Sequence, residues 1–164
     1  MLFRSFLERL EASRLRGEEL LWRFLPRAVA AKMAVVRKDP EERGGERQAL
    51  NLGHTLGHVL EAHLGLSHGE AVAQGLYFAL RWSRARAGLS PAEHRRLAGL
   101  LERLTGFAPG PGALPGVPEG TLLRLLRGDK KAGGGGRVTV VLLRAPGKPA
   151  RLAEIGRASC RERV

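Results

Sequence analysis

Residues 51–70 read NLGHTLGHVLEAHLGLSHGE and contain four of the five histidines in the chain, His54, His58, His63 and His68. His54 and His58 are four residues apart, so on an α-helix both imidazoles leave the same face, one turn from each other. Asn51 precedes His54 by about one turn of the same face. The spacing therefore predicts a polar, histidine-bearing stripe along one helix.

Gly53 and Gly57 form a second pair four residues apart, on the neighbouring face of the predicted helix. A glycine inside a helix costs roughly 1 kcal/mol relative to alanine, so two in successive turns indicate that something approaches the backbone closely. The sequence from His68 to Glu70 is typical of the start of the next helix. From there, a polar side chain can point back toward the first two histidines.

Two histidines on one helix face and a third at a nearby helix start are arranged like metal ligands, because zinc binds neutral imidazole nitrogens. There is also an ordinary explanation. A histidine of an amphipathic helix is more often a surface residue or a hydrogen-bonded core residue, and the HxxxH spacing arises often by chance. The adjacent glycines, Asn51 and the basic residues upstream favour a metal site over this alternative.

The hydrophobic periodicity predicts a mostly α-helical fold with one short β element near the C-terminus. Pro26 lies inside the second helical pattern, which predicts a kink or two shorter helices. Ser90 and Pro91 have the residue types of an N-cap and a first helical position. The helical patterns cover 6–15, 18–36, 69–87, 91–104 and 121–127, a Pro/Gly loop covers 105–118, and the β-branched run RVTVVLL predicts a strand at 137–143.

Length and composition predict one globular domain of 164 residues with 43% hydrophobic residues. No apolar run approaches the roughly 20 residues that a membrane span needs, and the N-terminus lacks the pattern of an export signal. Cys160 is the only cysteine, so no disulfide can form within the chain, which favours a cytoplasmic location. The formal net charge of +12 suits an anionic substrate or a nucleic acid.

The two ends of the chain have the character of translated adapter sequence. The head reads LFRS after Met1 and the tail reads EIGRASCRERV, and codons exist under which parts of the two are reverse complements. We therefore expect residues 1–5 and 154–164 to be non-native and the domain to cover 6–153. On this expectation Cys160 is not native either, and the natural chain continues differently at both ends.

Basic residues precede the histidine stretch. Lys32 falls near the apolar stripe of the second helix, where the ordinary interpretation is a surface lysine that extends its charged end into water. The loop at 38–48 is a polar turn that carries Arg47, four residues before Asn51. If the next helix starts early, Arg47 joins the histidine stripe. An arginine beside imidazoles suits an anionic ligand next to a metal.

Residues 32–61 read KMAVVRKDPEERGGERQALNLGHTLGHVLE, followed by HGEAV at 68–72 and by Asp129, Lys130 and Lys131 before an apolar strand. Together these segments resemble the C-terminal domain of the 3-dehydroquinate synthase family, over nearly all of residues 6–153. The combination of LNxGHTxGHxxE with HGEAV is long and highly specific. The resemblance implies that a nucleotide-binding α/β domain, absent from this chain, precedes a helical domain for metal and substrate.

The resemblance also implies a role for individual residues. His54 and His68 match the two histidine ligands of zinc, whose third ligand is a glutamate upstream of this chain, so we expect an incomplete metal site here. His58 matches the histidine that transfers protons with bound water and substrate. Glu42 takes the place of the family's acidic residue if the loop carries one extra residue. The positions that grip the carboxylate and phosphate of the substrate match Lys32, Arg47, Asn51 and the pair Lys130 and Lys131, of which either could make the contact.

The implied reaction converts 3-deoxy-arabino-heptulosonate 7-phosphate to 3-dehydroquinate and phosphate, with NAD and Zn²⁺ or Co²⁺ as cofactors. The implied enzyme is a cytoplasmic lyase of the shikimate pathway that is homodimeric when complete and binds no membrane or nucleic acid. The fragment itself is expected to be inactive. The alternatives are another sugar-phosphate cyclase, a metal-dependent alcohol dehydrogenase of the related two-domain fold, and a basic helical nucleic-acid-binding module. Scattered arginines and 5% aromatic residues disfavour the last of these.

Overall fold

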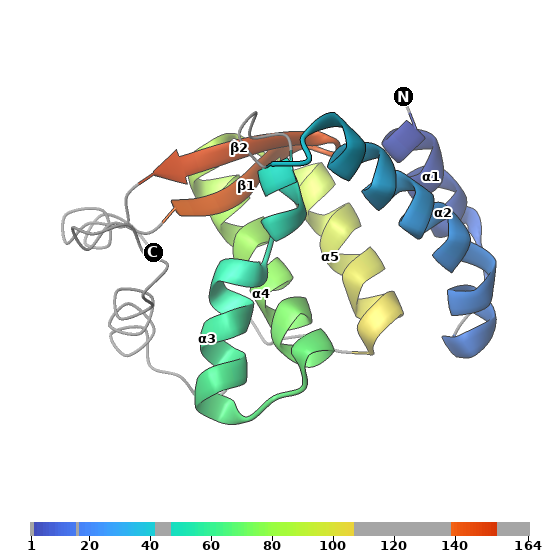
Figure 1. Cartoon of the computed structure of the whole chain (residues 1–164), viewed down its shortest axis with the longest axis horizontal. Helices are drawn as coiled ribbons and strands as arrows, with labels where there is room; N and C mark the ends of the chain where they lie inside the picture. Colours follow the sequence, from blue (N-terminus) through green and yellow to red (C-terminus); the bar gives the residue numbers. More distant parts are fainter. Residues whose placement is uncertain (1, 16, 42–46, 107–138, 154–164) are drawn as a thin grey trace.

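The computed structural model describes residues 2–15, 17–41, 47–106 and 139–153 (Figure 1). Helices dominate this part of the chain, as the periodicity predicts, and the predicted β element near the C-terminus is confirmed as a hairpin. None of the described helices is both long enough and apolar enough to span a membrane. The elements are α1 (Leu2–Ala12), α2 (Gly17–Lys38), the 3₁₀ helix η1 (Arg47–Asn51), α3 (His54–Leu64), α4 (His68–Trp82), the π-helical η2 (Ser83–Ala87), α5 (Pro91–Thr105), β1 (Thr139–Ala145) and β2 (Lys148–Ala153).

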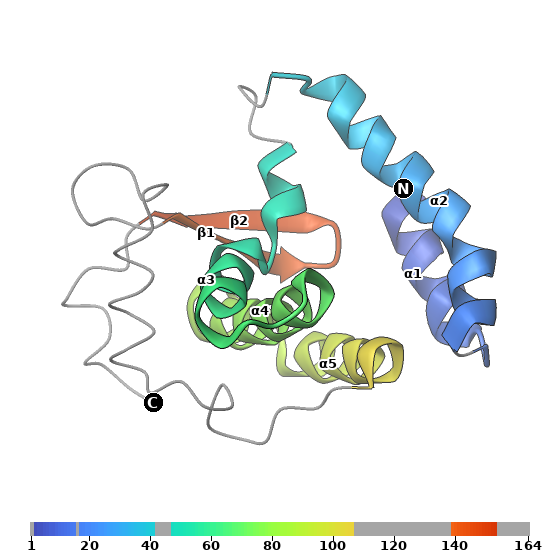
Figure 2. The same ribbon diagram turned by 60° about the horizontal axis from the view of Figure 1, so that its bottom comes forward.

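The first two helices form a pair that lies beside α5, on the opposite side from α3 and α4 (Figure 2). Leu10, Leu20, Phe24 and Leu100 make their common core. Phe6 packs edge-on against Phe24 with ring centroids 5.8 Å apart. Apolar contact between the pair and α5 therefore joins the N-terminal helices to the rest of the fold.

Proline does not divide α2. The helix runs as one element from Gly17 to Lys38 with Pro26 inside it, so of the two predicted outcomes, a kink or two shorter helices, the second is wrong. Proline removes the hydrogen bond to the carbonyl four residues earlier, that of Trp22. Both Pro26 and Trp22 lie on an exposed part of the helix, where water can satisfy the freed carbonyl.

Two arginines of α5 reinforce the contact with α1. Arg96 donates to the Glu11 carboxylate through Nε at 2.8 Å and through Nη2 at 2.6 Å. Arg103 donates to backbone carbonyls at the end of α1, to Glu11 at 3.1 Å, to Ser13 at 2.7 Å and to Leu10. The last carbonyls of a helix have no partner within the helix, so a cation in this position satisfies them and opposes the helix dipole.

The β-hairpin covers α3 and α4. Leu60 of α3 and Leu142 of β1 are fully buried in one apolar cluster, together with Leu56, Ala71 and Val140. Burial of a leucine side chain contributes about 1.5–3 kcal/mol. β1 and β2 are antiparallel, with Val141 opposite Arg151 and a register shift between Leu143 and Ala145. The second strand escaped sequence prediction because Pro149 and two basic residues interrupt its apolar pattern.

The helix predicted at 69–87 is observed as α4 followed by the π-helical turn η2. Buried Ser83 marks the change. Its hydroxyl donates to the Ala79 carbonyl at 2.5 Å and accepts from the Leu143 backbone N–H at 2.8 Å. Ser83 therefore ties the end of α4 to the hairpin. The helix predicted at 91–104 is confirmed as α5, with Ser90 as N-cap and Pro91 at the first position.

Candidate metal and substrate site

Glycines bring α3 and α4 into backbone contact. A Cβ built on Gly75 of α4 would overlap the Gly53 carbonyl oxygen and lie 3.0 Å from the Gly57 nitrogen. A Cβ on Gly57 would lie 3.2 Å from the Val72 Cα, tighter than ordinary van der Waals contact. The sequence predicts that something approaches the backbone at Gly53 and Gly57, and the structure shows that this element is α4. This approach sets the separation of the two helices that carry the histidines.

The histidine helix begins later than its spacing suggested. Gly53 is the N-cap of α3, with a left-handed φ of 79°, rather than an interior residue of the helix. Upstream of it, Arg47–Asn51 form a separate 3₁₀ helix. The prediction that Asn51 continues the helical stripe of His54 and His58 is therefore wrong, and the early helix start that would have added Arg47 to this stripe does not occur. A residue in the left-handed conformation interrupts a right-handed helix, and glycine adopts that conformation without steric cost.

A capped turn between α3 and α4 positions His68 beside His54 and His58. Gly65 ends α3 in a left-handed conformation, and His68 is the first residue of α4. Ser67 caps α4 by accepting from the Glu70 N–H, while the Glu70 carboxylate accepts from the Ser67 N–H at 3.1 Å and from its hydroxyl at 2.6 Å. The pKa of Glu70 is lowered below its usual value, mainly by the hydrogen bond from the Ser67 hydroxyl and secondly by the hydrogen bond from the Ser67 backbone N–H.

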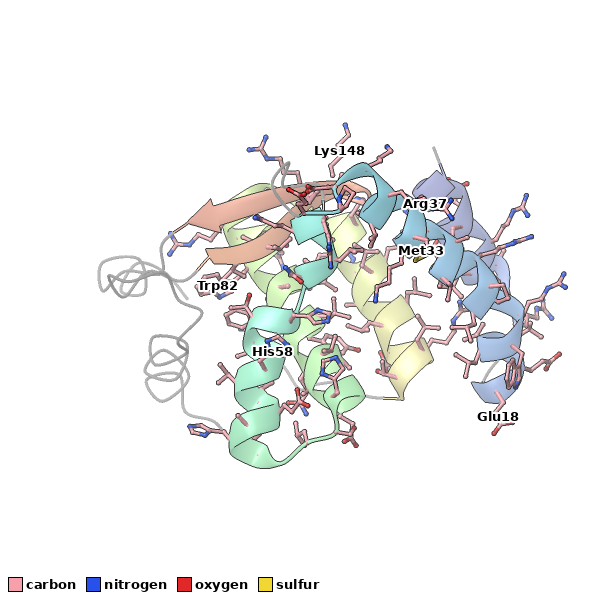
Figure 3. All side chains as sticks on the ribbon, viewed as in Figure 1. Glu18, Met33, Arg37, His58, Trp82 and Lys148 are labelled. Carbon is pink, nitrogen blue, oxygen red and sulfur yellow. The ribbon has the colours of Figure 1, made fainter. Side chains whose placement is uncertain are left out.

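Three imidazoles converge where the two helices meet. The ring centroids are 5.7 Å apart for His54 and His68, 5.8 Å for His54 and His58, and 6.2 Å for His58 and His68. Figure 3 labels His58 on α3. His63 lies nine residues after His54, about half a turn around α3, so it belongs to the opposite face. This arrangement agrees with the expectation from the sequence that His54, His58 and His68 come together.

Hydrogen bonds orient two of the rings. The Nδ1 atom of His54 is 3.3 Å from the Leu52 carbonyl oxygen, and the Nδ1 atom of His68 is 3.1 Å from Oε2 of Glu61. Both partners are acceptors, so in the neutral form of each ring the proton lies on Nδ1 and Nε2 keeps its lone pair. Sequence reasoning gave Glu61 no role. Its position seven residues after His54, on the same face of α3, is the signal that could have revealed it.

The donor set suits a zinc or cobalt ion in part. Two imidazoles that share one zinc at about 2.0–2.1 Å have ring centroids roughly 5 Å apart, close to the 5.7 Å between His54 and His68. Hydrogen-bonded Nδ1 atoms and free Nε2 lone pairs are also typical of histidine ligands. Among the described residues, no group of three or more His, Cys, Asp or Glu is arranged to hold a metal ion by itself. The two imidazoles fit the ion as part of a larger ligand set.

Three other predicted site residues, Lys32, Arg47 and Asn51, lie in the elements that precede α3. Arg47 is held to the connection after α2: its backbone N–H donates to Asp39 at 3.2 Å and its Nη1 donates to the Pro40 carbonyl at 2.6 Å. Asn51 is exposed at the end of η1, and Lys32 is exposed on α2. The remaining predicted residues, Glu42, Lys130 and Lys131, lie outside the described residues.

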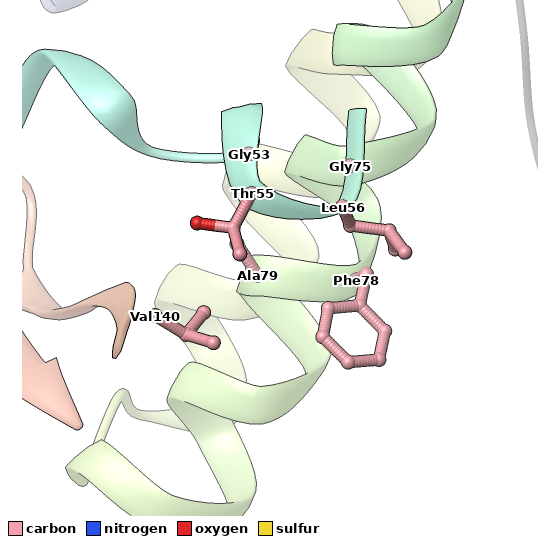
Figure 4. Close-up of a pocket in the computed structure, with 7 residues that line it drawn as sticks. All are labelled: Gly53, Thr55, Leu56, Gly75, Phe78, Ala79 and Val140. Carbon is pink, nitrogen blue, oxygen red and sulfur yellow. The ribbon is translucent and has the colours of Figure 1, made fainter. Parts of the chain in front are cut away.

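A small depression next to the histidines has a different character. Gly53 and Gly75 form one side of it, and its other lining residues are apolar apart from Thr55 (Figure 4). No histidine lines it. Because it offers almost no polar group to a charged ligand, it is packing space between α3, α4 and β1 rather than part of the candidate site.

Two solved structures with a similar fold are of 2-deoxy-scyllo-inosose synthase. The chain superimposes on 2-deoxy-scyllo-inosose synthase complexed with carbaglucose-6-phosphate, NAD⁺ and Co²⁺, with a TM-score of 0.60 and 25% identity, over 88% of this chain and 39% of that chain. A second structure of 2-deoxy-scyllo-inosose synthase gives a TM-score of 0.57 at 25% identity, over 83% of this chain and 35% of the other. The chain thus has the fold of a domain of these synthases.

The sequence comparisons define the family. Residues 1–132 match the family described as 3-dehydroquinate synthase C-terminal. The 3-dehydroquinate synthase of Geobacillus kaustophilus (strain HTA426) is 45% identical over 79% of this chain and 34% of the relative. That of Acidithiobacillus ferrooxidans (strain ATCC 53993) is 38% identical over 93% of this chain and 42% of the relative. The chain belongs to the C-terminal domain family of the 3-dehydroquinate synthases. It spans about a third to two fifths of these relatives.

Proposed function

We propose that this chain is the metal- and substrate-binding part of a 3-dehydroquinate synthase, which converts 3-deoxy-arabino-heptulosonate 7-phosphate to 3-dehydroquinate and phosphate. The observation that carries the proposal is the convergence of His54, His58 and His68 at one helix crossing. A related cyclase is the second candidate, supported by the likeness to 2-deoxy-scyllo-inosose synthase. Identities of 45% to 3-dehydroquinate synthases against 25% to that cyclase favour the first.

His54 and His68 hold the metal in this proposal, each through Nε2. When bound, Zn²⁺ or Co²⁺ would polarise the secondary alcohol of the substrate and the ketone derived from it, and NAD would accept and return the hydride. The hydrogen bonds at Nδ1 point Nε2 of each ring away from Leu52 and Glu61, and in the neutral ring Nε2 carries the lone pair that binds a metal. The binding of NAD is assigned to a part of the protein outside this chain.

His58 is the proton-transfer residue in this proposal. It lies one turn along α3 from His54 and its ring stacks on that of His68 with an interplanar angle of 29°, so it can exchange a proton with a substrate held beside the metal. Lys32, Arg47 and Asn51, together with Lys130 or Lys131, bind the carboxylate and phosphate of the substrate through charge-assisted hydrogen bonds. Glu42 supplies the acidic residue of the same site.

The test is performed on the full-length protein, because this chain alone is not expected to release phosphate with added NAD. His54→Ala and His68→Ala should weaken binding of Co²⁺ more than about 100-fold, beyond the 10–100-fold effect of altering a residue behind a ligand. His58→Ala should leave Co²⁺ affinity nearly unchanged and lower phosphate release by about 10²–10⁴-fold, the range of a lost general acid or base.

His63→Ala is the matched control, because His63 belongs to the opposite face of α3. It should change neither metal affinity nor phosphate release. The assignment of the metal ligands is wrong if His63→Ala loses Co²⁺ as completely as His54→Ala does. The assignment of the reaction is wrong if the metal-loaded protein releases no phosphate from the seven-carbon substrate with NAD present.

A further inference from the structure

We propose that Glu61 is a positioning residue of the metal site, which fixes the tautomer and the orientation of His68. This inference rests on the proposed function, because it concerns the nitrogen that His68 offers to the metal. The observation that carries it is the hydrogen bond between Nδ1 of His68 and Oε2 of Glu61 at 3.1 Å. Glu61 does not itself touch the substrate in this proposal.

Glu61 lies on the face of α3 that carries the other two histidines. His54, His58 and Glu61 follow at intervals of four and three residues, so all three side chains leave α3 within about 60° of one another. His68 arrives from the start of α4 and lies against all three. One helix face therefore provides two imidazoles together with the carboxylate that holds the third.

The chemistry of the contact determines which nitrogen of His68 is free. An ionised carboxylate can only accept a hydrogen bond, so Nδ1 of His68 must donate and the lone pair of the neutral ring lies on Nε2. For His54, the Leu52 carbonyl oxygen is the corresponding acceptor, 3.3 Å from Nδ1. A backbone carbonyl cannot be removed by substitution, whereas Glu61 can, so the two ligands differ in a way that an experiment can use.

The local fold does not depend on this carboxylate. The turn between α3 and α4 is held by Gly65 and by the capping box of Ser67 and Glu70. The packing of the two helices is set by the contact of Gly53 and Gly75. Replacement of Glu61 should therefore leave the helices in place. Any effect on His68 then reports orientation of the ring rather than loss of structure.

The expected effect is modest because both groups face water. The His68 side chain is 57% exposed and that of Glu61 is 40% exposed. Loss of a partner behind a histidine ligand costs about 10–100-fold in metal affinity, and water competes for an exposed hydrogen bond, so we expect the low end, about tenfold.

The experiment uses the full-length protein with ¹⁵N-labelled histidine. In the metal-free wild type, at an alkaline pH at which the ring is neutral, the His68 nitrogen shifts should show a protonated Nδ1 and an unprotonated Nε2. Glu61→Ala and Glu61→Leu both lack an acceptor and suit a half-exposed helix position; each should give a mixture of tautomers and about tenfold weaker Co²⁺ binding. Glu61→Gln keeps an acceptor oxygen and should restore most of both properties.

Glu70→Gln is the matched control, since it removes one carboxylate beside His68 while glutamine can still close the capping box. It should leave the His68 tautomer and the Co²⁺ affinity unchanged. The inference is overturned if Glu61→Ala preserves the wild-type tautomer, or if Glu70→Gln alters it equally. It is also overturned if Glu61→Gln loses as much affinity as Glu61→Ala, because Glu61 would then be a direct ligand.

Failure of this inference can be distinguished from failure of the proposed function. The tautomer is measured without metal, substrate or NAD, so it tests the role of Glu61 even if His54 and His68 bind no metal. Conversely, loss of Co²⁺ binding in His54→Ala and His68→Ala, combined with an unchanged tautomer in Glu61→Ala, would overturn the role of Glu61 alone.

Discussion

At the scale of single residues, the site depends on glycines, which have no side chain, as much as on the histidines. Gly53 and Gly75 allow the backbones of α3 and α4 to touch, and this contact brings His68 within 5.7 Å of His54 between ring centroids. A larger residue at either position would separate the helices. The imidazole cluster would then open, although every histidine would remain in the sequence.

Gly75→Ala tests this dependence. The new methyl group would overlap backbone atoms of Gly53, which cannot move as a flexible side chain can, so we expect destabilisation of about 3 kcal/mol or more and weaker Co²⁺ binding by the full-length protein. Urea unfolding measures the first effect. Gly99→Ala is the control: Gly99 lies within α5 with open space around its Cα, so alanine there should stabilise by about 0.5–1 kcal/mol. Equal stability of the two variants would contradict the argument.

At the scale of helices and strands, α5 is the connection between two parts of the fold. One side of it takes part in the cluster of Tyr77, Leu80 and Leu101, next to α4. Another side carries Leu100 and the two arginines that hold α1. The position of α2, and of Lys32 on it, therefore depends on its contacts with α1, with α5 and with the 3₁₀ helix η1.

Arg103→Ala should loosen this connection. Its guanidinium satisfies carbonyls of Leu10, Glu11 and Ser13, and hydrogen bonds from a charged donor contribute about 1.5–3 kcal/mol, less where water can replace them. We therefore expect a loss of about 1–2 kcal/mol, with faster amide exchange in α1 and α2 and unchanged exchange in α3. Arg95→Ala, at the exposed neighbour of Arg96, is the control and should change neither. Uniform acceleration of exchange over all helices would argue against a local connection.

At the scale of the whole molecule, most of the large exposed apolar side chains among the described residues lie on α2. Leu25 and Val29 are 40% and 50% exposed, and Trp22 is 71% exposed. Lys32 follows Val29 by three residues, so it borders the same face. A contiguous apolar face of this kind is typical of an interaction surface. The chain by itself should therefore associate with other copies.

Sedimentation velocity at increasing concentration measures this association. We expect the wild-type chain to form larger species, and the double variant Leu25→Glu and Val29→Glu to remain monomeric at the same concentrations, because charge on an apolar contact must be desolvated. Ala34→Glu is the control: Ala34 is exposed on α2 but on the other side of the helix, so the added charge should not prevent association. If Ala34→Glu dissolves the larger species equally well, general charge repulsion rather than the apolar face is responsible.

The sequence by itself determined the helical class, the start of α5 and the family. Those properties follow from local patterns: the period of the apolar residues, the Ser90–Pro91 cap, and a motif long enough to exclude chance. The i,i+4 spacing of His54 and His58 placed both on one face because helix geometry alone requires it. Roles for Glu42, Lys130 and Lys131 were predicted from the motif and fall outside the described residues.

Only the tertiary structure decided what the local patterns could not. The sequence does not show that Gly53 turns into a left-handed conformation and separates Arg47 and Asn51 from the histidine helix, because glycine is compatible with both conformations. The sequence also does not show that the Gly53 carbonyl packs against Gly75, or that Glu61 and His68 form a hydrogen bond across the turn between α3 and α4. These are contacts between segments whose separation is set by packing, and packing is a property of the folded chain as a whole.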